Sequence, residues 1–513
     1  MADTDPQTIR AINWREVFPF TNLFRAFRIA VHPSKLILAL AALLVLYIGG
    51  RIMDGVWPAR HSAVYREMDE YTRPTADESR RDFADTVQQA RERNQRQYAG
   101  ILQASGVVTN PDQALKDAER FDHVGEVKRR INAARAQVEV DANRRYEEQR
   151  KTADALTDAA AKERAHREAR DKRDRDVAAA MASAHAEWER LDQMLPQGIF
   201  ETFFGYQVSQ VNSIAKGILA FEWRAVYAGV ENFFFTGPVW LLRFHPVYFV
   251  LFMALFLVVW AVFGGAIARI AAVHVARDEK ISVRQAMKFS TNKVLSFIFA
   301  PLIPLAIVLV IGVVLSLGGL LFYVPVIGPI LAGALFILAL LGGVVITLVL
   351  LGTFGGFNLM YPTIAVEGSD SFDAISRSFS YVFARPWRML FYTLIALIYG
   401  AIAYFFVRLF VWIVLATTRF FVGWWLGGQP GRWFPEMWPQ SMDLWNLPYD
   451  VHFASLAWSE KVAAFFIACW VYLLVSLVGA FAISFYFSVN TIIYYLMRRE
   501  VDATELDDVY VEE

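Results

Sequence analysis

Long apolar runs alternate with polar and charged segments along this chain. Six of the runs are roughly 20 residues long or longer, about the length that an α-helix needs to cross the hydrocarbon core of a bilayer. The runs cover approximately residues 36–52, 246–268, 294–320, 328–353, 389–414 and 462–488. This pattern predicts an all-α, polytopic helical membrane protein with about six transmembrane helices.

Similar segments that mix basic and apolar residues precede three of the runs. These segments are Thr21–Leu40, Ser282–Pro301 and Ser371–Leu390. Two of them carry small residues four positions apart, which lie on one helical face and let two backbones approach closely. The pairs are Ala286 with Ser290 and Ala374 with Ser378. We therefore predict three cytoplasmic amphipathic elbow helices, which either frame a pathway between helix bundles, as in transporters, or only solve a packing problem.

The charged and proline residues of the elbow segments give further expectations. Four basic residues are expected at the level of the lipid headgroups. They are Lys288, Lys293, Arg377 and Arg385. Pro301 and Pro386 are expected to turn the chain near the membrane surface, because proline interrupts a helix and restricts the residue before it.

A long polar insertion follows the first apolar run. Residues 126–195 contain no Gly or Pro, and apolar residues recur there at heptad-like spacing. The recurring residues are Val127, Ile131, Ala134 and Val138. The segment fits either one helix of roughly 105 Å or a hairpin that turns near "KTADALTD". Its apolar stripe is too thin to bury much surface by itself, so this extracytoplasmic helical or coiled-coil insertion is expected to self-associate or to bind a partner.

The segment that returns to the membrane is amphipathic. Apolar residues recur at helical spacing from Phe200 to Ile218, so the segment is expected to lie along the outer leaflet or to pack on the transmembrane helices. The resulting divisions are a cytoplasmic N-terminal segment (1–35), transmembrane helix 1 (36–52), the extracytoplasmic domain (53–198), the amphipathic segment (199–244), the membrane bundle with five helices and an external loop at 417–461 (245–497), and an acidic cytoplasmic tail (498–513).

The charge balance adds orientation but no chemical partner. The 513 residues contain 50 Lys+Arg and 50 Asp+Glu, so net charge gives no argument for nucleic-acid binding. About sixteen basic residues fall on one side of the predicted bundle and about three in the short loops of the other side. This bias predicts a multi-pass protein of the bacterial inner (cytoplasmic) membrane, with both termini cytoplasmic and residues 53–244 extracytoplasmic.

One arginine and five tryptophans are the candidate interaction or pathway residues. Arg408 lies about 28 Å along a helix from Met389, near the outer interface, where it can snorkel to water or contact a salt-bridge partner or an anionic ligand. The last external loop is rich in tryptophan, which suits either an interfacial belt with a docking role or a lid for a sugar or lipid. These residues are Trp424, Trp425, Trp433, Trp438 and Trp445.

The apolar runs offer little chemistry of their own. The third and fourth runs lack ionisable residues and are rich in glycine, which indicates close helix packing or broken transporter helices. The chain has no H-E-x-x-H, G-x-S-x-G or phosphate-binding glycine loop, and Cys469 is its one cysteine. We therefore expect no catalytic, cofactor-binding or metal-binding residues.

Two stretches carry a resemblance to known membrane proteins. "GGAIARIAAVHVARDEKISVRQAMKFSTNKVLSFIFAPLIP" (Gly264–Pro304) and "YPTIAVEGSDSFDAISRSFSYVFARPWRML" (Tyr361–Leu390) resemble uncharacterised polytopic bacterial membrane proteins. They are also loosely similar to the membrane portion of glycerophosphodiester phosphodiesterase-type proteins. The resemblance covers roughly residues 245–415 and concerns architecture. The catalytic barrel of those phosphodiesterases has no counterpart here, so the resemblance implies no catalytic residue.

Together these features predict a non-enzymatic integral membrane scaffold or complex subunit. Its extracytoplasmic helices at 126–195 are expected to bind a protein partner or a second copy, and its apolar runs to contact membrane lipid. The alternative is a transporter or channel for a lipid or an uncharged solute. An enzyme that acts on lipid or glycan through the tryptophan-rich loop is a third possibility.

Overall fold

The computed structural model describes residues 18–72, 79–424, 437–439, 443–445 and 458–510. Every named element in these ranges is a helix, and the one isolated β-bridge joins Ala63 to Gln197. The predicted all-α class is confirmed.

Six helices are long and apolar enough to cross a membrane, as the hydrophobic pattern predicted. They are α3 (Pro33–Val56), α12 (Pro246–Val259) continued by η4 (Trp260–Gly264) and α13 (Gly265–Arg277), α15 (Val294–Gly319) with η5 (Leu320–Tyr323), α16 (Ile327–Glu367), α18 (Pro386–Trp424) and α20 (Trp458–Asp502). The chain is therefore a membrane protein.

A short helix directly precedes three of these long helices. The three junction helices are α2 (Arg25–Ala30), α14 (Val283–Asn292) and α17 (Ser371–Ala384). The chain leaves helical geometry at Arg385 before Pro386, as expected, but the other predicted proline turn is wrong. The α14–α15 break lies at Lys293, and Pro301 lies inside α15, where the helix already has seven residues before it.

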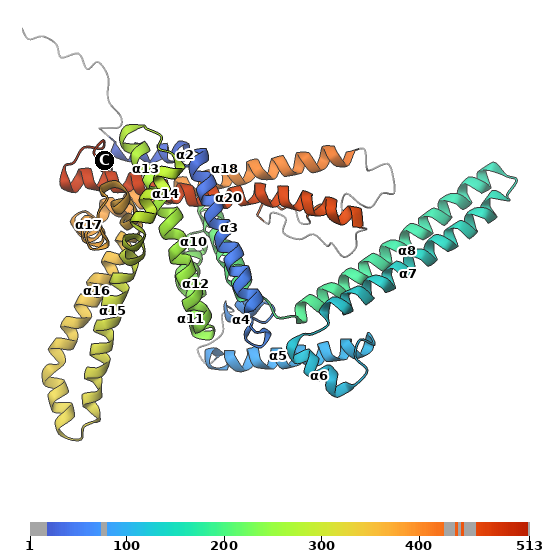
Figure 1. Cartoon of the computed structure of the whole chain (residues 1–513), viewed down its shortest axis with the longest axis horizontal. Helices are drawn as coiled ribbons and strands as arrows, with labels where there is room; N and C mark the ends of the chain where they lie inside the picture. Colours follow the sequence, from blue (N-terminus) through green and yellow to red (C-terminus); the bar gives the residue numbers. More distant parts are fainter. Residues whose placement is uncertain (1–17, 73–78, 425–436, 440–442, 446–457, 511–513) are drawn as a thin grey trace, which may run out of the picture.

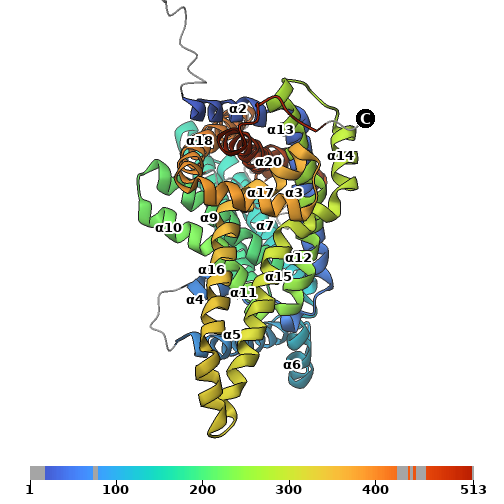
Figure 2. The same cartoon turned by 90° about the vertical axis from the view of Figure 1, so that its left-hand side faces the viewer.

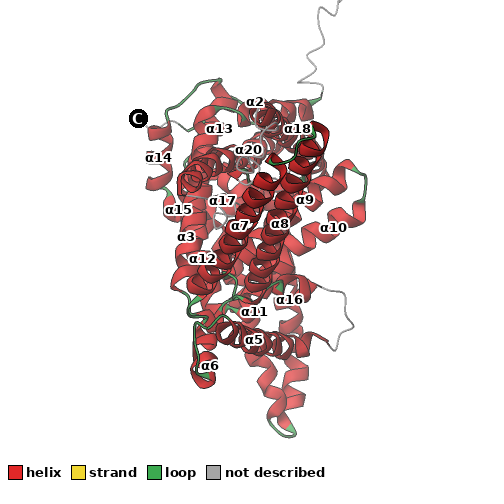
Figure 3. Ribbon diagram, turned by 90° about the vertical axis from the view of Figure 1, so that its right-hand side faces the viewer, coloured by secondary structure: helices red, strands yellow, loops and turns green. Residues whose placement is uncertain are grey.

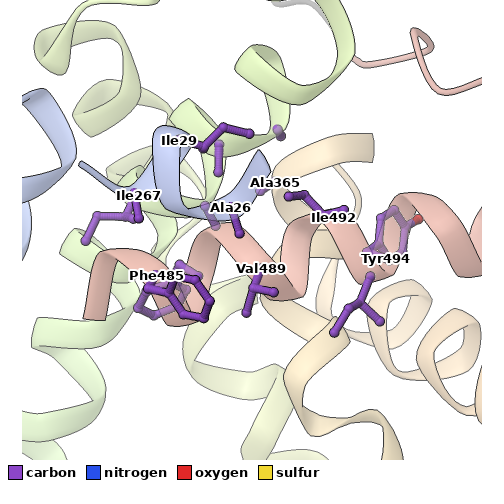
Figure 4. Close-up of a cluster of buried hydrophobic side chains, with 14 of the residues drawn as sticks. Ala26, Ile29, Ile267, Ala365, Phe485, Val489, Ile492 and Tyr494 are labelled. Carbon is purple, nitrogen blue, oxygen red and sulfur yellow. The ribbon is translucent and has the colours of Figure 1, made fainter. Parts of the chain in front are cut away.

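The long helices form three apolar legs that point away from a common hub (Figures 1 and 2). The legs pair α3 with α12, α15 with α16, and α18 with α20. The hub contains α2, α13, α14, α17 and the C-terminal parts of α16 and α20. Its core gathers side chains from four of these helices, such as Ile29, Ile267, Ala365 and Val489 (Figure 4). Large apolar side chains on the legs are exposed in the protein alone, as expected for surfaces in contact with lipid.

The hub explains why the elbow-like segment occurs three times. Each repeat has an incoming long helix, a junction helix and an outgoing long helix: α12–α13, α14 and α15; then α16, α17 and α18; and finally α20, α2 and α3. The third repeat is thus assembled from the two ends of the chain.

Each junction helix uses a pair of small, fully buried residues to reach its incoming helix. The pairs are Ala26 with Ala30, Ala286 with Ser290, and Ala374 with Ser378. Ser290 lies against Gly265, and a Cβ at Gly356 would lie 3.2 Å from Ser378. In the third repeat, the Ser484 hydroxyl donates to the Ala30 carbonyl at 2.7 Å. Close backbone approach through small residues is therefore a shared feature of all three contacts.

The remaining helices lie between α3 and α12 in the sequence. They are α4 (Glu67–Thr72), α5 (Ser79–Ala104), α6 (Pro111–Arg120), α7 (Val124–Asp154), α8 (Ala159–Met194), α9 (Ile199–Leu219), α10 (Trp223–Glu231) and α11 (Gly237–Phe244), with short helical turns at η2 (Ala59–His61) and η3 (Asn232–Thr236). A further short turn, η1 (Pro19–Phe24), precedes α2. Helices α7 and α8 form an antiparallel hairpin, which we call the arm; it extends away from the legs (Figures 1 and 3). The hairpin alternative for residues 126–195 is the correct one.

Candidate functional site

The arm is held together by a narrow seam of small residues. Ala142 and Ala153 of α7 and Ala169, Val177 and Ala184 of α8 are buried along the hairpin. Small side chains let the two helices lie close together, but they bury little apolar area. The long arm therefore leaves most of its polar surface in solvent.

The predicted heptad-like stripe is only partly right. Val127 is buried and Ile131 is half-buried, whereas Ala134 and Val138 are exposed. Further along α7, Glu139 is half-buried and Ala142 is buried instead, because the hairpin partner, and not the spacing of apolar residues alone, decides which face is covered. Val138, Val140 and Leu156 remain as exposed apolar side chains on the arm.

The base of the arm is its best-packed part. A cluster of buried side chains joins α5, α6, α7 and α8; it contains Tyr98, Ala99, Leu102, Ala114, Ala118, Val127 and Leu191. The Tyr98 hydroxyl donates to the Asp122 carbonyl at 2.5 Å. Burial raises the pKa of Tyr98 to about 12. The base thus anchors the arm through apolar packing and a buried hydrogen bond.

The tip of the arm is closed by polar contacts. Asp158 caps α8 by accepting from the Ala160 amide at 3.1 Å. The Asp154 carboxylate lies 3.0 Å from Lys162 Nζ and 3.1 Å from His166 Nε2. The hydrogen bond from Lys162 is the main cause that lowers the pKa of Asp154. The turn at 155–158 lies within the predicted "KTADALTD".

Arg408 is a buried clamp and does not snorkel to water. Its side chain is 2 % exposed, and its nitrogens donate to the Leu444 and Trp445 carbonyls, both at 2.6 Å. It also donates to Asn212 Oδ1 at 3.0 Å and to the Tyr404 hydroxyl at 2.9 Å. The planar guanidinium thus joins α18, α9 and the segment after α18 through neutral acceptors. The snorkelling interpretation is wrong because α9 and this segment cover the side chain.

The predicted amphipathic segment contains helix α9, which Arg408 helps to fix to the bundle. Helix α9 packs on α3 and α18 through its apolar stripe. Asp54 accepts from the Phe200 amide at 2.9 Å and the Glu201 amide at 3.2 Å, which satisfies the N-terminus of α9. Further along α9, Asn212 accepts from Tyr404 and Arg408. Helix α9 is therefore fixed to two legs of the bundle.

The five tryptophans do not form one surface among the described residues. Trp445 is half-buried, with its ring centroid 5.6 Å from the Arg408 guanidinium carbon, and Trp438 is 4 % exposed. Trp424 is 62 % exposed at the end of α18. Trp425 and Trp433 lie outside the described residues. Of the described candidates, Trp445 contacts Arg408, and Trp438 lies in the same buried cluster as Tyr404.

A polar network on the hub is the largest feature that sequence reasoning missed. Glu367, which ends α16, pairs with Arg377 at 2.9 Å and with Arg498 at 3.4 Å, and accepts from the Tyr494 hydroxyl. Arg377 was expected at lipid headgroups, but these carboxylates neutralise it; Asp373 lies 3.3 Å away. Arg498 and Tyr494 lie more than 100 positions from Glu367 in the chain, so spacing along the chain could not reveal these two contacts.

The same face of the hub holds the C-terminal tail. Arg269 donates to the Ala365 carbonyl at 2.8 Å and to the Tyr510 carbonyl at 2.7 Å. The Tyr510 amide donates to the Val366 carbonyl. The Tyr510 ring lies 2.6 Å from the Cβ position of Gly368 and leaves no room for a side chain there, and the positive φ of Gly368 also favours glycine. Asp370 caps α17 by accepting from the Asp373 amide at 2.9 Å. The network therefore ties the tail to α13 and α16.

Close packing explains only part of the glycine content of α15 and α16. A Cβ at Gly342 would lie 3.1 Å from Leu315, and one at Gly352 would meet Phe379 at 2.7 Å. Nothing lies within 4 Å of the Cβ position at five other glycines: Gly312, Gly318, Gly319, Gly333 and Gly343. For these five positions the structure contains no close contact that requires glycine.

The described residues include no group of three or more His, Cys, Asp or Glu side chains that could hold a metal ion. The chain matches no protein-family model, and no curated protein or solved structure is significantly similar to it. A functional argument must therefore rest on the geometry of the arm, the clamp and the hub.

Proposed function

We propose that this chain is a non-enzymatic integral membrane scaffold or complex subunit whose arm binds a partner protein or a second copy. The observation that carries the proposal is a hairpin of 31 and 36 residues that extends away from the legs. At 1.5 Å per residue its helices reach about 46 and 54 Å. Helices of this length extend far from the bundle and add little to the packing of the rest of the molecule, so we infer that they serve to contact another molecule.

The energetics of the arm support the same proposal. Its seam consists mainly of alanine, so each turn buries little apolar surface to offset the ordering of long charged side chains. The exposed Val138 and Val140 offer additional apolar area to a partner. Binding along the arm would therefore stabilise a helix pair that is weakly held by its own contacts.

The membrane setting of the proposal follows the Lys/Arg bias. The hub, with both chain ends, faces the cytoplasm of a bacterial inner membrane, and the arm lies on the extracytoplasmic side. The junction helices α2 and α14 lie at the cytoplasmic membrane interface, with Lys288 and Lys293 near lipid headgroups. In this orientation the Arg408 clamp fixes the external helices to the bundle.

A shortened arm tests the proposal. Lys128 pairs with Asp192 at 2.7 Å, and Arg173 lies over the Tyr146 ring at 4.7 Å, which defines the register of the hairpin. Deleting residues 140–150 and 170–180 together removes about three turns from each helix and keeps this register. The base cluster and the tip remain. The variant and the unaltered protein are extracted gently from native membranes, and the mass and composition of each complex are determined.

The unaltered protein is expected to form a stoichiometric complex that the shortened variant loses. The matched control is Leu156→Ser, which changes an exposed apolar side chain at the tip and leaves the arm at full length. An unchanged complex in the shortened variant would contradict the proposal. A monomer with bound solute in the unaltered protein would favour the transporter alternative.

A further inference from the structure

A group of nitrogen-bearing basic side chains lies where two of the repeats meet at the hub. His32 precedes α3, Lys35 lies in its first turn, and His274 lies in the last turn of α13. The centroids of the two imidazole rings are 6.1 Å apart. Asp278 lies 3.4 Å from His274 Nε2 and 3.9 Å from Arg28. We call this place the α3 junction.

Two buried nitrogen atoms of the α3 junction lack hydrogen-bond partners among the described residues. They are Lys35 Nζ, on a side chain with no exposed surface, and His32 Nδ1. A buried donor or charge without a partner is costly, so such groups are normally paired with protein, water or a ligand. The junction therefore has capacity for an acceptor that the described protein residues do not supply.

The α3 junction has more basic than acidic side chains, which favours an anion as its ligand. Arg28, Lys35 and Lys280 are basic, and the facing carboxylate is Asp278, which contacts Arg28 and His274. Burial first and the charge of Lys35 second lower the pKa of His32, which shows that the positive charges act on it. The N-terminus of the 24-residue helix α3 adds the positive end of a helix dipole.

The position of the α3 junction suggests the source of the anion. Helix α3 starts at Pro33 and the span that contains α13 ends at Arg277, so the junction lies at the end of two transmembrane segments. Lipid phosphate groups occupy this level of a membrane. Lys35 Nζ is buried in the structure, so a headgroup phosphate must enter the junction to reach it, and the flexible four-carbon stem lets the ammonium move toward the phosphate.

We infer that the α3 junction binds a phosphate group, with Lys35, His32 and His274 as the donors. This inference concerns the hub and goes beyond the proposed role of the arm. A bound phosphate would give Lys35 Nζ and His32 Nδ1 the acceptors they lack, and would balance the excess positive charge. The same excess of positive charge opposes a divalent metal ion at the two histidines.

Binding to the purified full-length protein tests the inference. Native mass spectrometry would titrate the protein with dioleoylphosphatidylglycerol and with dioleoylglycerol, which lacks the phosphate; inorganic phosphate would be titrated separately. Lys35→Met keeps the apolar stem and removes the charge, and Lys288→Met is the matched control on the exposed face of α14. The phosphate-bearing lipid is expected to bind better than its analogue. Lys35→Met is expected to weaken its binding about tenfold to a hundredfold, the range for a hydrogen bond to a charged group.

The remaining outcomes show whether the phosphate belongs to a lipid or to a soluble anion, and which results would overturn the inference. Inorganic phosphate binding that depends on Lys35, without lipid binding, would support the site with a soluble anion as its ligand. Equal effects of Lys35→Met and Lys288→Met, or no effect of Lys35→Met on either ligand, would overturn the inference. Lys280→Ala changes an exposed side chain and keeps the buried packing intact. We expect its affinity for the phosphate-bearing ligand to fall severalfold, and this measurement tests the inference if Lys35→Met fails to fold.

Discussion

Arg408 shows how far one residue can be understood from its place in a sequence. Its distance from Met389 predicted a position near the outer end of a membrane helix, but not its burial. Its acceptors come from Asn212 and from the segment at Leu444, which are 196 and 36 residues away in the chain. A charge in an apolar helix signals that some partner exists; the identity of the partner depends on tertiary structure.

Replacing Arg408 tests the clamp directly. Arg408→Met is expected to leave the buried carbonyls of Leu444 and Trp445 without donors, at a cost of about 1–3 kcal/mol for each unsatisfied group. Hydrogen exchange should rise at residues 443–445, and thermal stability should fall. Arg408→Lys keeps the charge but lacks the planar fork, so it should give an intermediate result. Unchanged exchange at 443–445 in Arg408→Met would show that the clamp does not hold this segment.

Tyr98 provides a test at the base of the arm. Tyr98→Phe keeps the ring in its buried cluster but leaves the Asp122 carbonyl without its donor. We expect the arm base to lose about 1 kcal/mol of stability. Chemical denaturation followed by helical circular dichroism would measure the loss. Equal stability of the variant and the unaltered protein would mean that the hydrogen bond makes no net contribution.

At the scale of elements, the arm tip should respond to acid. The pKa of Asp154 is lowered in the folded arm, so its stabilising contribution is present above the carboxyl's unfolded pKa and is lost as pH falls through the folded value. Hydrogen exchange at residues 152–166 should therefore rise below about pH 4. Asp154→Asn should show fast exchange already at neutral pH and little further change in acid. A tip that opens equally in both proteins would contradict this role of Asp154.

The contact between α13 and α14 gives a second test among the helices. A Cβ at Gly265 would clash with Ser290 Oγ and would lie 2.7 Å from the Phe297 ring. Gly265→Ala is expected to destabilise the hub by about 1–3 kcal/mol, the usual cost of overpacking. Gly312→Ala is the control because nothing lies within 4 Å of its Cβ position. Thermal unfolding in detergent should separate the two variants; equal melting temperatures would refute the close approach.

The elements also show why local pattern predicted some features and missed others. The small pairs at Ala286/Ser290 and Ala374/Ser378 correctly indicated helix contacts, because close approach demands small residues wherever it occurs. The predicted stripe of the arm failed beyond Ile131, since Ala134 and Val138 are exposed whereas the charged Glu139 is half-buried. The apolar positions alone therefore do not define the face that a long charged helix covers.

At the scale of the whole molecule, apolar length was enough to predict six long helices but not their pairing. Helix α20 contacts α2 and α3, which begin the chain, and completes the third repeat with them. This contact joins Ser484 to Ala30 across 454 positions. The repeat was visible in the sequence as three similar segments, but only the fold shows that its third copy is split between the chain ends.

The proposed orientation can be tested with single cysteines. In a Cys469→Ala background, which removes the one native cysteine, Leu156→Cys on the arm tip should react with a membrane-impermeant thiol reagent in cells with a permeable outer envelope. Lys280→Cys, on the hub, should react only after the inner membrane is opened. Reaction of both cysteines before opening, or the reverse order, would contradict the orientation inferred from the Lys/Arg bias.

If the arm holds this protein in a larger assembly, the 58.2 kDa chain extracted gently from its own membrane should have the mass of a complex. The mass of the extracted protein should therefore be measured, and every protein that accompanies it identified. We expect a defined homo-oligomer or a stoichiometric partner. A monomer without any protein partner, from a chain with an intact arm, would rule out this role of the arm.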